Sequence, residues 1–176
     1  AFASIEAQTL RAKGGSIEWI VVESCSPRQD LRVWLAHKTT MKLDNLVVRV
    51  VNLRENVNNI AVSWNLGLDL ARGEHVCLLD ADNRKRPEFL ERLCGWLDAH
   101  PDRNAVRCKT QNIDAMGTPQ DVRGNPGELE LAAELASNWV DSGEIVFRRS
   151  LVDRIGPFDD RMKACEDWDF VARIVA

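Results

Sequence analysis

The chain has 176 residues, of which 45% are hydrophobic, so it is long and apolar enough to bury one core within a single domain. Its formal net charge of −4 and pI of about 5.4 argue against nonspecific attraction to nucleic acid or to an acidic membrane surface. No apolar run approaches the roughly 20 residues that span a bilayer, so we expect no nucleic-acid partner and no membrane segment in residues 1–176.

The cysteines and histidines give no pattern typical of a metal centre. The five cysteines are scattered and form no C-x-x-C pair, which predicts neither a zinc knuckle nor a disulfide framework. We therefore expect a reducing compartment, the cytoplasm, with the cytoplasmic face of a membrane reached only through other segments or partners. The three histidines lie far apart in the sequence, so each is interpreted as a surface or strand residue.

Strand-like and helix-like segments alternate along the first half of the chain. In chain order these are a helix end, a strand, a helix, a strand and a helix, at residues 5–10, 17–22, 30–37, 46–51 and 59–71. Ile60, Trp64 and Leu68 recur at helical spacing in the last of them. Such alternation is typical of an α/β fold with a mostly parallel sheet and helices on both faces.

The second half continues the alternation. It contains a strand, a helix, a strand, a Gly-rich loop, a helix, a strand and two helices, at residues 74–79, 87–97, 105–109, 117–127, 129–135, 144–147, 151–155 and from 166 onward. The chain opens in a helix and stops at Ala176 inside another helix. We therefore expect residues 1–176 to form a single domain that lacks its first strand and its C-terminal elements.

Two acids stand directly after the apolar strand at residues 74–79. Asp80 and Asp82 are separated by one residue, so both can project to the same side at the strand end. Ligands of α/β sheets bind beyond the carboxyl ends of the strands, and paired carboxylates suit Mg²⁺ or Mn²⁺. The alternative is a turn, in which Asp82 or Asn83 caps the helix that begins near Pro87. The strand before the acids and the helix after them favour the metal site.

A second acidic cluster, Glu166, Asp167 and Asp169, surrounds Trp168 near the end of the chain. Carboxylates interact favourably with the positive end of a helix dipole, so the simpler interpretation is a charged first helical turn. The cluster becomes informative because it follows the Asp80 pair in a particular order. Between the two lie an Arg-Arg segment at residues 148–149 and a Gly-x-Phe-Asp segment at residues 156–159.

This order resembles the family 2 glycosyltransferases of the GT-A fold, which are inverting enzymes that transfer sugars from nucleotide diphosphate donors. The likeness covers almost the whole chain. The segments that carry it lie at residues 20–26, 65–67, 71–74, 79–82, 148–150, 155–159 and 166–169. Each is weak to moderate alone, and together in this order they are a strong indication.

The resemblance implies a role for each acid. Glu23 would hold the uracil or other base, Asp80 would lie near the ribose and diphosphate, and Asp82 with Asp80 would bind Mn²⁺ or Mg²⁺. Asp167 would be the general base that removes the proton of the acceptor hydroxyl, and a single displacement would invert the anomeric centre. The implied partners are a UDP-sugar donor and a carbohydrate or other hydroxyl acceptor.

Four further residues have roles that the resemblance only suggests. Glu166 would contact the acceptor or orient its loop, and Trp168 would stack on a sugar face, although core packing explains Trp168 equally well. Arg148 or Arg149 would approach phosphate.

Glu23 and Ser24 stand where the family usually carries two aspartates, which motivates a second hypothesis. It is a non-catalytic nucleotide-sugar or carbohydrate-binding module of the same fold. A sugar nucleotidyltransferase would usually show a Gly-rich phosphate loop, which the sequence lacks. A glycoside hydrolase needs two carboxylates facing each other across roughly 5–10 Å, which suits adjacent acids less well than a metal does.

Overall fold

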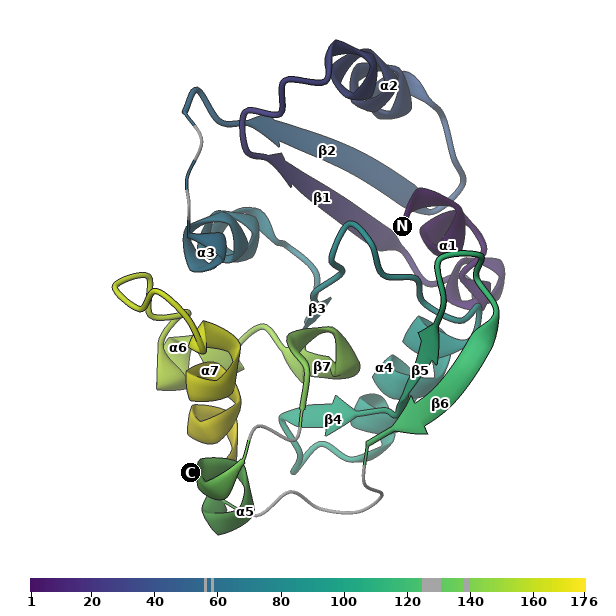
Figure 1. The fold of residues 1–176 in the computed structure, drawn as a ribbon. Helices are drawn as coiled ribbons and strands as arrows, with labels where there is room; N and C mark the ends of the chain where they lie inside the picture. Colours follow the sequence, from purple (N-terminus) through teal and green to yellow (C-terminus); the bar gives the residue numbers. More distant parts are fainter. Residues whose placement is uncertain (56, 58, 125–130, 138–139) are drawn as a thin grey trace.

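A computed structural model describes residues 1–55, 57, 59–124, 131–137 and 140–176 (Figure 1). The strands are β1 (Ile17–Glu23), β2 (Leu46–Asn52), β3 (His75–Cys77), β4 (Ala105–Arg107), β5 (Thr110–Ile113), β6 (Pro119–Arg123) and β7 (Ile145–Arg148). The helices are α1 (Phe2–Glu6), α2 (Gln29–Thr40), α3 (Ile60–Leu70), α4 (Phe89–Ala99), α5 (Leu131–Ala136), α6 (Leu151–Ile155) and α7 (Glu166–Val175), with 3-10 turns η1 (Thr9–Lys13) and η2 (Ser142–Glu144).

The strands pair in both directions. β1 and β2 run parallel, with Ile17 opposite Leu46 and Glu23 opposite Asn52. β7 lies between β3 and β4 and is antiparallel to both. The α/β class is confirmed, while the parallel arrangement predicted for most of the sheet holds only for β1 with β2 among the described pairs. The alternation of strands and helices in the sequence does not predict the direction of β7, because β7 follows a long connection after β6.

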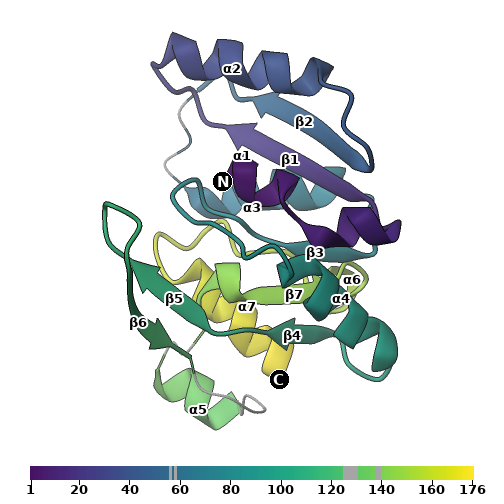
Figure 2. The ribbon, with the colours of Figure 1, turned by 90° about the vertical axis from the view of Figure 1, so that its right-hand side faces the viewer.

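Helices cover both faces of the strands, as predicted. Figure 2 shows β2, β1, β3, β7 and β4 one above another, with α1 and α4 in front and α3 behind. Successive residues of β7 point to opposite faces. Ile145 and Phe147 join a core formed with α3, α6 and α7, whereas Val146 packs with Cys94 and Leu97 of α4. The central strand is therefore buried on both sides, which fixes the position of the turn η2 that precedes it.

The Gly-rich segment predicted as a loop at residues 117–127 contains a strand. β5 and β6 form an antiparallel hairpin, and Gly117 adopts φ +84° in its turn. Asp114 Oδ1 accepts the backbone N–H groups of Met116 and Thr118, each at 2.9 Å, which closes that turn. Residues 125–127 of the predicted loop, and residues 129–130 of the predicted helix that became α5, lie outside the described residues.

Among the described residues, none of the helices combines the length and the apolar character needed to cross a lipid bilayer.

Candidate active site

The segment after β3 presents Asp80 and Asp82 at a tight turn. Asn83 donates its backbone N–H to the Asp80 carbonyl at 3.1 Å and its side-chain amide to Asp80 Oδ2 at 3.3 Å. Asp80 is half-buried and Asp82 is exposed. The N-cap position of α4 is Glu88, which makes no side-chain capping bond, so neither Asp82 nor Asn83 caps the helix and the capping alternative is wrong. The turn instead serves to hold the Asp80 carboxylate.

A third carboxylate, Asp141, lies close to this turn. Burial raises the pKa of Asp80 above its ordinary value, and the negative charges of Asp141 and Asp82 raise it further. Asp141 is fixed because its Oδ1 accepts the Gly143 N–H at 2.8 Å at the start of η2. The sequence analysis missed Asp141. The available signal was an acid two residues before a glycine at the entrance to a buried strand.

Lys85 connects the Asp80 turn to η2. Its Nζ donates a hydrogen bond to the Gly143 carbonyl and lies 4.5 Å from the centroid of the Phe89 ring. A Cβ atom on Gly143 would lie 3.1 Å from Asp141 Oδ1 and 3.5 Å from Lys85 Nζ, so a glycine is required for this close approach. Lys85 supplies the positive charge that partly offsets the acids and lowers the pKa of Asp80.

Glu144 extends the acidic cluster into the interior. Glu144 is only 4% exposed. Burial raises the pKa of its carboxyl group, and the negative charge of Asp141 raises it further. Its Oε2 atom has no hydrogen-bond partner among the described residues. Lys85 acts on Asp80 and Arg123 acts on Glu144, so the acidic cluster, defined as Asp80, Asp82, Asp141 and Glu144, has more acids than nearby cations and fits a bound cation.

The pH dependence of this cluster gives a first prediction. Because the folded state raises the pKa of Asp80 above 3.8, the stability contributed by this group falls as the pH rises through that raised value, while its affinity for cations increases. Asp141→Asn removes one neighbouring charge and should lower the pKa of Asp80. Carboxyl-carbon NMR titration should show the Asp80 midpoint moving to lower pH. An unchanged midpoint would mean that Asp141 does not act on Asp80.

Asp167 shares a small gap with residues that neighbour the acidic cluster in the chain. It belongs to the first turn of α7 and lines a small, largely apolar pocket together with Leu78 and Ser142. Leu78 is two residues before Asp80, and Ser142 directly follows Asp141. Asp167 therefore shares one small gap with residues that lie close in the chain to Asp80 and Asp141.

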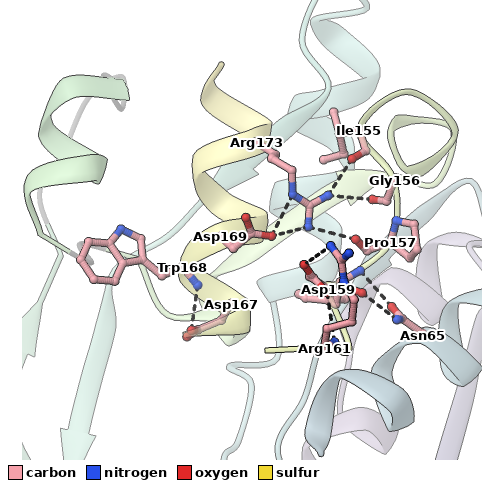
Figure 3. Close-up of polar contacts among 11 residues, drawn as sticks. Asn65, Ile155, Gly156, Pro157, Asp159, Arg161, Asp167, Trp168, Asp169 and Arg173 are labelled. Carbon is pink, nitrogen blue, oxygen red and sulfur yellow. Dashed lines mark hydrogen bonds and ion pairs between the residues drawn. The ribbon is translucent and has the colours of Figure 1, made fainter. Parts of the chain in front are cut away.

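The other residues of the 166–169 cluster have different surroundings. Arg173 binds Asp169 Oδ2 at 2.7 Å and donates to the Ile155 and Pro157 carbonyls at 2.6 and 2.9 Å (Figure 3). Asp169 therefore fastens α7 to the turn after α6. Trp168 is half-buried and extends away from this network on the side of α5 (Figure 3). Glu166 has a buried Oε2 atom with no hydrogen-bond partner among the described residues.

Asn65 of α3 uses both the donor and the acceptor of its side-chain amide to bind the backbone of Phe158. Its amide donates to the Phe158 carbonyl at 2.8 Å and its Oδ1 accepts the Phe158 N–H at 2.9 Å (Figure 3). Phe158 is buried and stacks on Phe170 of α7 with ring centroids 4.0 Å apart. This paired contact joins α3 to the turn that leads into α7, and so it positions Asp167.

Asn65→Ala should lower the free energy of unfolding by about 1–3 kcal/mol, because it leaves both backbone groups of Phe158 without their partner. Asn65→Asp is the matched variant, since it keeps the acceptor and loses the donor, and it should also destabilise the protein. Urea denaturation followed by tryptophan fluorescence measures both. A change below about 0.5 kcal/mol in Asn65→Ala would contradict the assigned role.

Glu23 lies at the carboxyl end of β1 and is 5% exposed. Its Oε1 atom accepts the Ser26 N–H, and its Oε2 atom lies 3.7 Å from Arg32 Nε without a hydrogen-bond partner among the described residues. A buried carboxylate with an available acceptor at a strand end is suited to recognise an N–H donor of a ligand.

The structure places the two predicted phosphate contacts elsewhere, which corrects that expectation. Arg148 lies opposite His75, at the start of β3, and its guanidinium binds Glu74 Oε1 at 3.0 Å and the Leu97 carbonyl at 2.7 Å. Arg149 Nε donates to the Gly73 carbonyl at 3.2 Å. Asp80 follows the other end of β3. β7 runs antiparallel to β3, so these arginines are carried away from the acidic cluster.

Comparison with known proteins places the chain in a family. The sequence model described as Glycosyl transferase family 2 matches residues 1–154. The chain belongs to this family. It is 32% identical over 129 residues to the amylovoran biosynthesis glycosyltransferase AmsB of Erwinia amylovora, covering 69% of this chain and 42% of that protein.

Two further similarities agree with this assignment. The chain is 28% identical over 132 residues to the uncharacterized glycosyltransferase YwdF of Bacillus subtilis, covering 73% of this chain and 48% of YwdF. In structure it matches S. aureus TarS residues 1–349 in complex with UDP, with a TM-score of 0.73 and 23% identity, over 98% of this chain and 49% of TarS. The chain therefore spans less than two thirds of each of these proteins, and the likeness to TarS shows the fold alone.

Proposed function

We propose that the chain is the nucleotide-sugar-binding and catalytic core of an inverting glycosyltransferase, which moves a sugar from a UDP-sugar to a hydroxyl group of an acceptor. The observation that carries this proposal is the acidic cluster, together with the small gap that Asp167 lines with Leu78 and Ser142, which lie close in the chain to Asp80 and Asp141. Membership of glycosyl transferase family 2 and a UDP complex of the TarS fold support the choice of reaction and of donor.

A divalent cation fits the residues of the acidic cluster. Asp80 and Asp82 would hold Mn²⁺ or Mg²⁺, because both offer only oxygen ligands and the mutual repulsion of Asp80, Asp82 and Asp141 is relieved by a positive charge. When bound, the cation neutralises the charge that builds on the departing nucleoside diphosphate. Lys85 holds η2 against the same turn and so keeps Asp141 in place.

Asp167 would act as the general base. A carboxylate beside the pocket can accept the proton of the acceptor hydroxyl as its oxygen attacks the anomeric carbon, opposite to the departing diphosphate, and this single displacement inverts the anomeric centre. Glu23 would accept an N–H group of the base through its buried carboxylate. Glu166 and Trp168, which flank Asp167 in the chain, would contact the acceptor.

The test of this proposal is a donor panel. The protein is incubated with UDP-, GDP- and dTDP-sugars in the presence of Mn²⁺ or Mg²⁺, and release of the nucleoside diphosphate is measured with and without simple sugar acceptors. We expect release from a UDP-sugar that increases with acceptor. Tight UDP binding without any release would support the non-catalytic binding module instead, and the absence of both would contradict the proposed site.

A further inference from the structure

A second cluster of metal-ligating side chains lies at the start of β3. Glu74, His75 and Asp98 each offer one ligand atom, and these atoms lie within 4.8 Å of one another. Within the part of the chain that the structure describes, no other group of three or more His, Cys, Asp or Glu side chains has its ligand atoms so close together. We propose that Glu74, His75 and Asp98, called here the β3–α4 cluster, bind Zn²⁺ or a similar transition-metal ion.

The spacing of the ligand atoms fits tetrahedral coordination. Zn²⁺ binds imidazole nitrogen and carboxylate oxygen at about 2.0–2.1 Å, which places neighbouring ligands of a tetrahedron about 3.3 Å apart. His75 Nε2 and Asp98 Oδ1 are 3.5 Å apart. The exposed Glu74 would supply the third protein ligand, and water would be the fourth.

The chemistry of the ligands selects a different metal from that of the acidic cluster. An imidazole favours zinc, copper, iron or nickel, whereas the oxygen ligands of Asp80 and Asp82 favour magnesium or manganese. The two sites lie at opposite ends of β3, because His75 begins the strand and Asp80 follows its end. A metal at the β3–α4 cluster is therefore separate from one that assists the proposed sugar transfer.

The burial of His75 provides an independent reason to expect a ligand. The His75 side chain is 13% exposed, and its Nε2 atom is buried with no hydrogen-bond partner among the described residues. A buried ring nitrogen that makes no hydrogen bond is costly, and a cation bound between it and the Asp98 carboxylate 3.5 Å away would satisfy it. Asp98 is 61% exposed and Glu74 is 73% exposed, so the cation can enter from solvent.

Arg148 contacts both elements that carry the β3–α4 cluster, and its charge affects the affinity of the cluster for a metal ion. Its guanidinium binds Glu74 Oε1 at 3.0 Å and the Leu97 carbonyl at 2.7 Å, so the start of β3 and the end of α4 are held at a constant distance. The positive charge of Arg148 weakens the binding of any divalent cation relative to a cluster without it, and the imidazole of His75 is the ligand that favours Zn²⁺ over Mg²⁺.

A metal at this position would connect the two elements that bound the Asp80 turn. β3 leads into that turn and α4 follows it, while His75 and Asp98 lie at their far ends. The ion would add a cross-link between strand and helix to the contact that Arg148 already makes. We therefore assign the β3–α4 cluster a structural role.

Cobalt provides the test, because tetrahedral Co²⁺ absorbs visible light much more strongly than octahedral Co²⁺. Protein freed of metal with a chelator is titrated with Co²⁺, and then Zn²⁺ is added. We expect one tetrahedral Co²⁺ per chain, displaced by Zn²⁺. Asp98→Asn and His75→Gln should each weaken Co²⁺ binding at least tenfold, because each removes a direct ligand.

Two matched variants make the result specific. His37→Gln changes an exposed histidine on α2 and should leave the cobalt spectrum unchanged, and Asp82→Ala should leave it unchanged because it alters only the acidic cluster. Circular dichroism checks that each variant is folded. If His75→Gln does not fold, Asp98→Asn still decides the question, because Asp98 is exposed. No tetrahedral cobalt signal in the parent protein, or equal affinity in Asp98→Asn, overturns the proposal.

Discussion

Asp167→Asn should lower the turnover number for sugar transfer by about 10²–10⁴-fold, which is the usual contribution of a general base. The amide has nearly the same shape as the carboxylate, but it cannot accept the proton of the attacking hydroxyl. UDP binding should change little, because Asp167 lines the pocket beside Leu78 and Ser142 and is not a member of the acidic cluster. Initial rates at saturating donor, together with calorimetric titration of UDP, measure the two effects separately.

Asp169→Asn is the control for that substitution. It removes the same charge from the same helix, two residues away, yet its carboxylate is bound by Arg173 at 2.9 and 2.7 Å. We expect Asp169→Asn to lower stability while the folded protein keeps most of its turnover. Equal activity in Asp167→Asn and the parent protein would refute the assignment of the base. Equal losses in both variants would show that helix packing, and not proton transfer, explains the effect.

The sequence alone predicts a site at Asp80 and Asp82 because their local neighbours single them out. An apolar strand, two acids at i and i+2, and a following helix are all visible within a short stretch. Asp167 required the resemblance to a family, since nothing local separates it from Asp169. The structure distinguishes the two acids through Arg173, which engages Asp169 and leaves Asp167 beside the pocket.

Asp141 and the arginines show what local patterns miss. Their positions depend on β7 running antiparallel between β3 and β4. This pairing brings Asp141 to Asp80 at one end and takes Arg148 to Glu74 at the other. The direction of a strand after a long connection is set by tertiary packing, so adjacency to a motif in the chain is a poor guide to adjacency in space.

β6 and His75 were missed for different physical reasons. The residues of β6 are all exposed, so the strand lacks the alternation of apolar and polar residues by which half-buried strands are found. His75 has no second histidine nearby, and its proposed partner Asp98 comes from a helix 23 residues further along the chain (98 minus 75). Metal sites assembled from a strand and a helix leave no short spacing pattern.

Asp82→Ala should weaken the Mn²⁺-dependent binding of UDP by at least about 100-fold. Loss of residues that merely orient metal ligands typically costs about 10–100-fold in metal affinity, and Asp82 is proposed to be a direct ligand. Asp82 is exposed, so its replacement should leave the fold intact. Calorimetric titration of UDP at fixed Mn²⁺, repeated in the presence of a chelator, measures the cation-dependent part of the affinity.

The comparison with the chelator makes this prediction sharper than a simple loss of binding. UDP contacts that do not involve the cation, including the one proposed for Glu23, should survive in Asp82→Ala, so its residual affinity should equal that of the parent protein with chelator. Asp102→Ala removes an exposed acid after α4 and should bind UDP like the parent. If Asp82→Ala kept its response to Mn²⁺, the cation would have to be held by other members of the acidic cluster, with Asp80 and Asp141 as the pair to replace next.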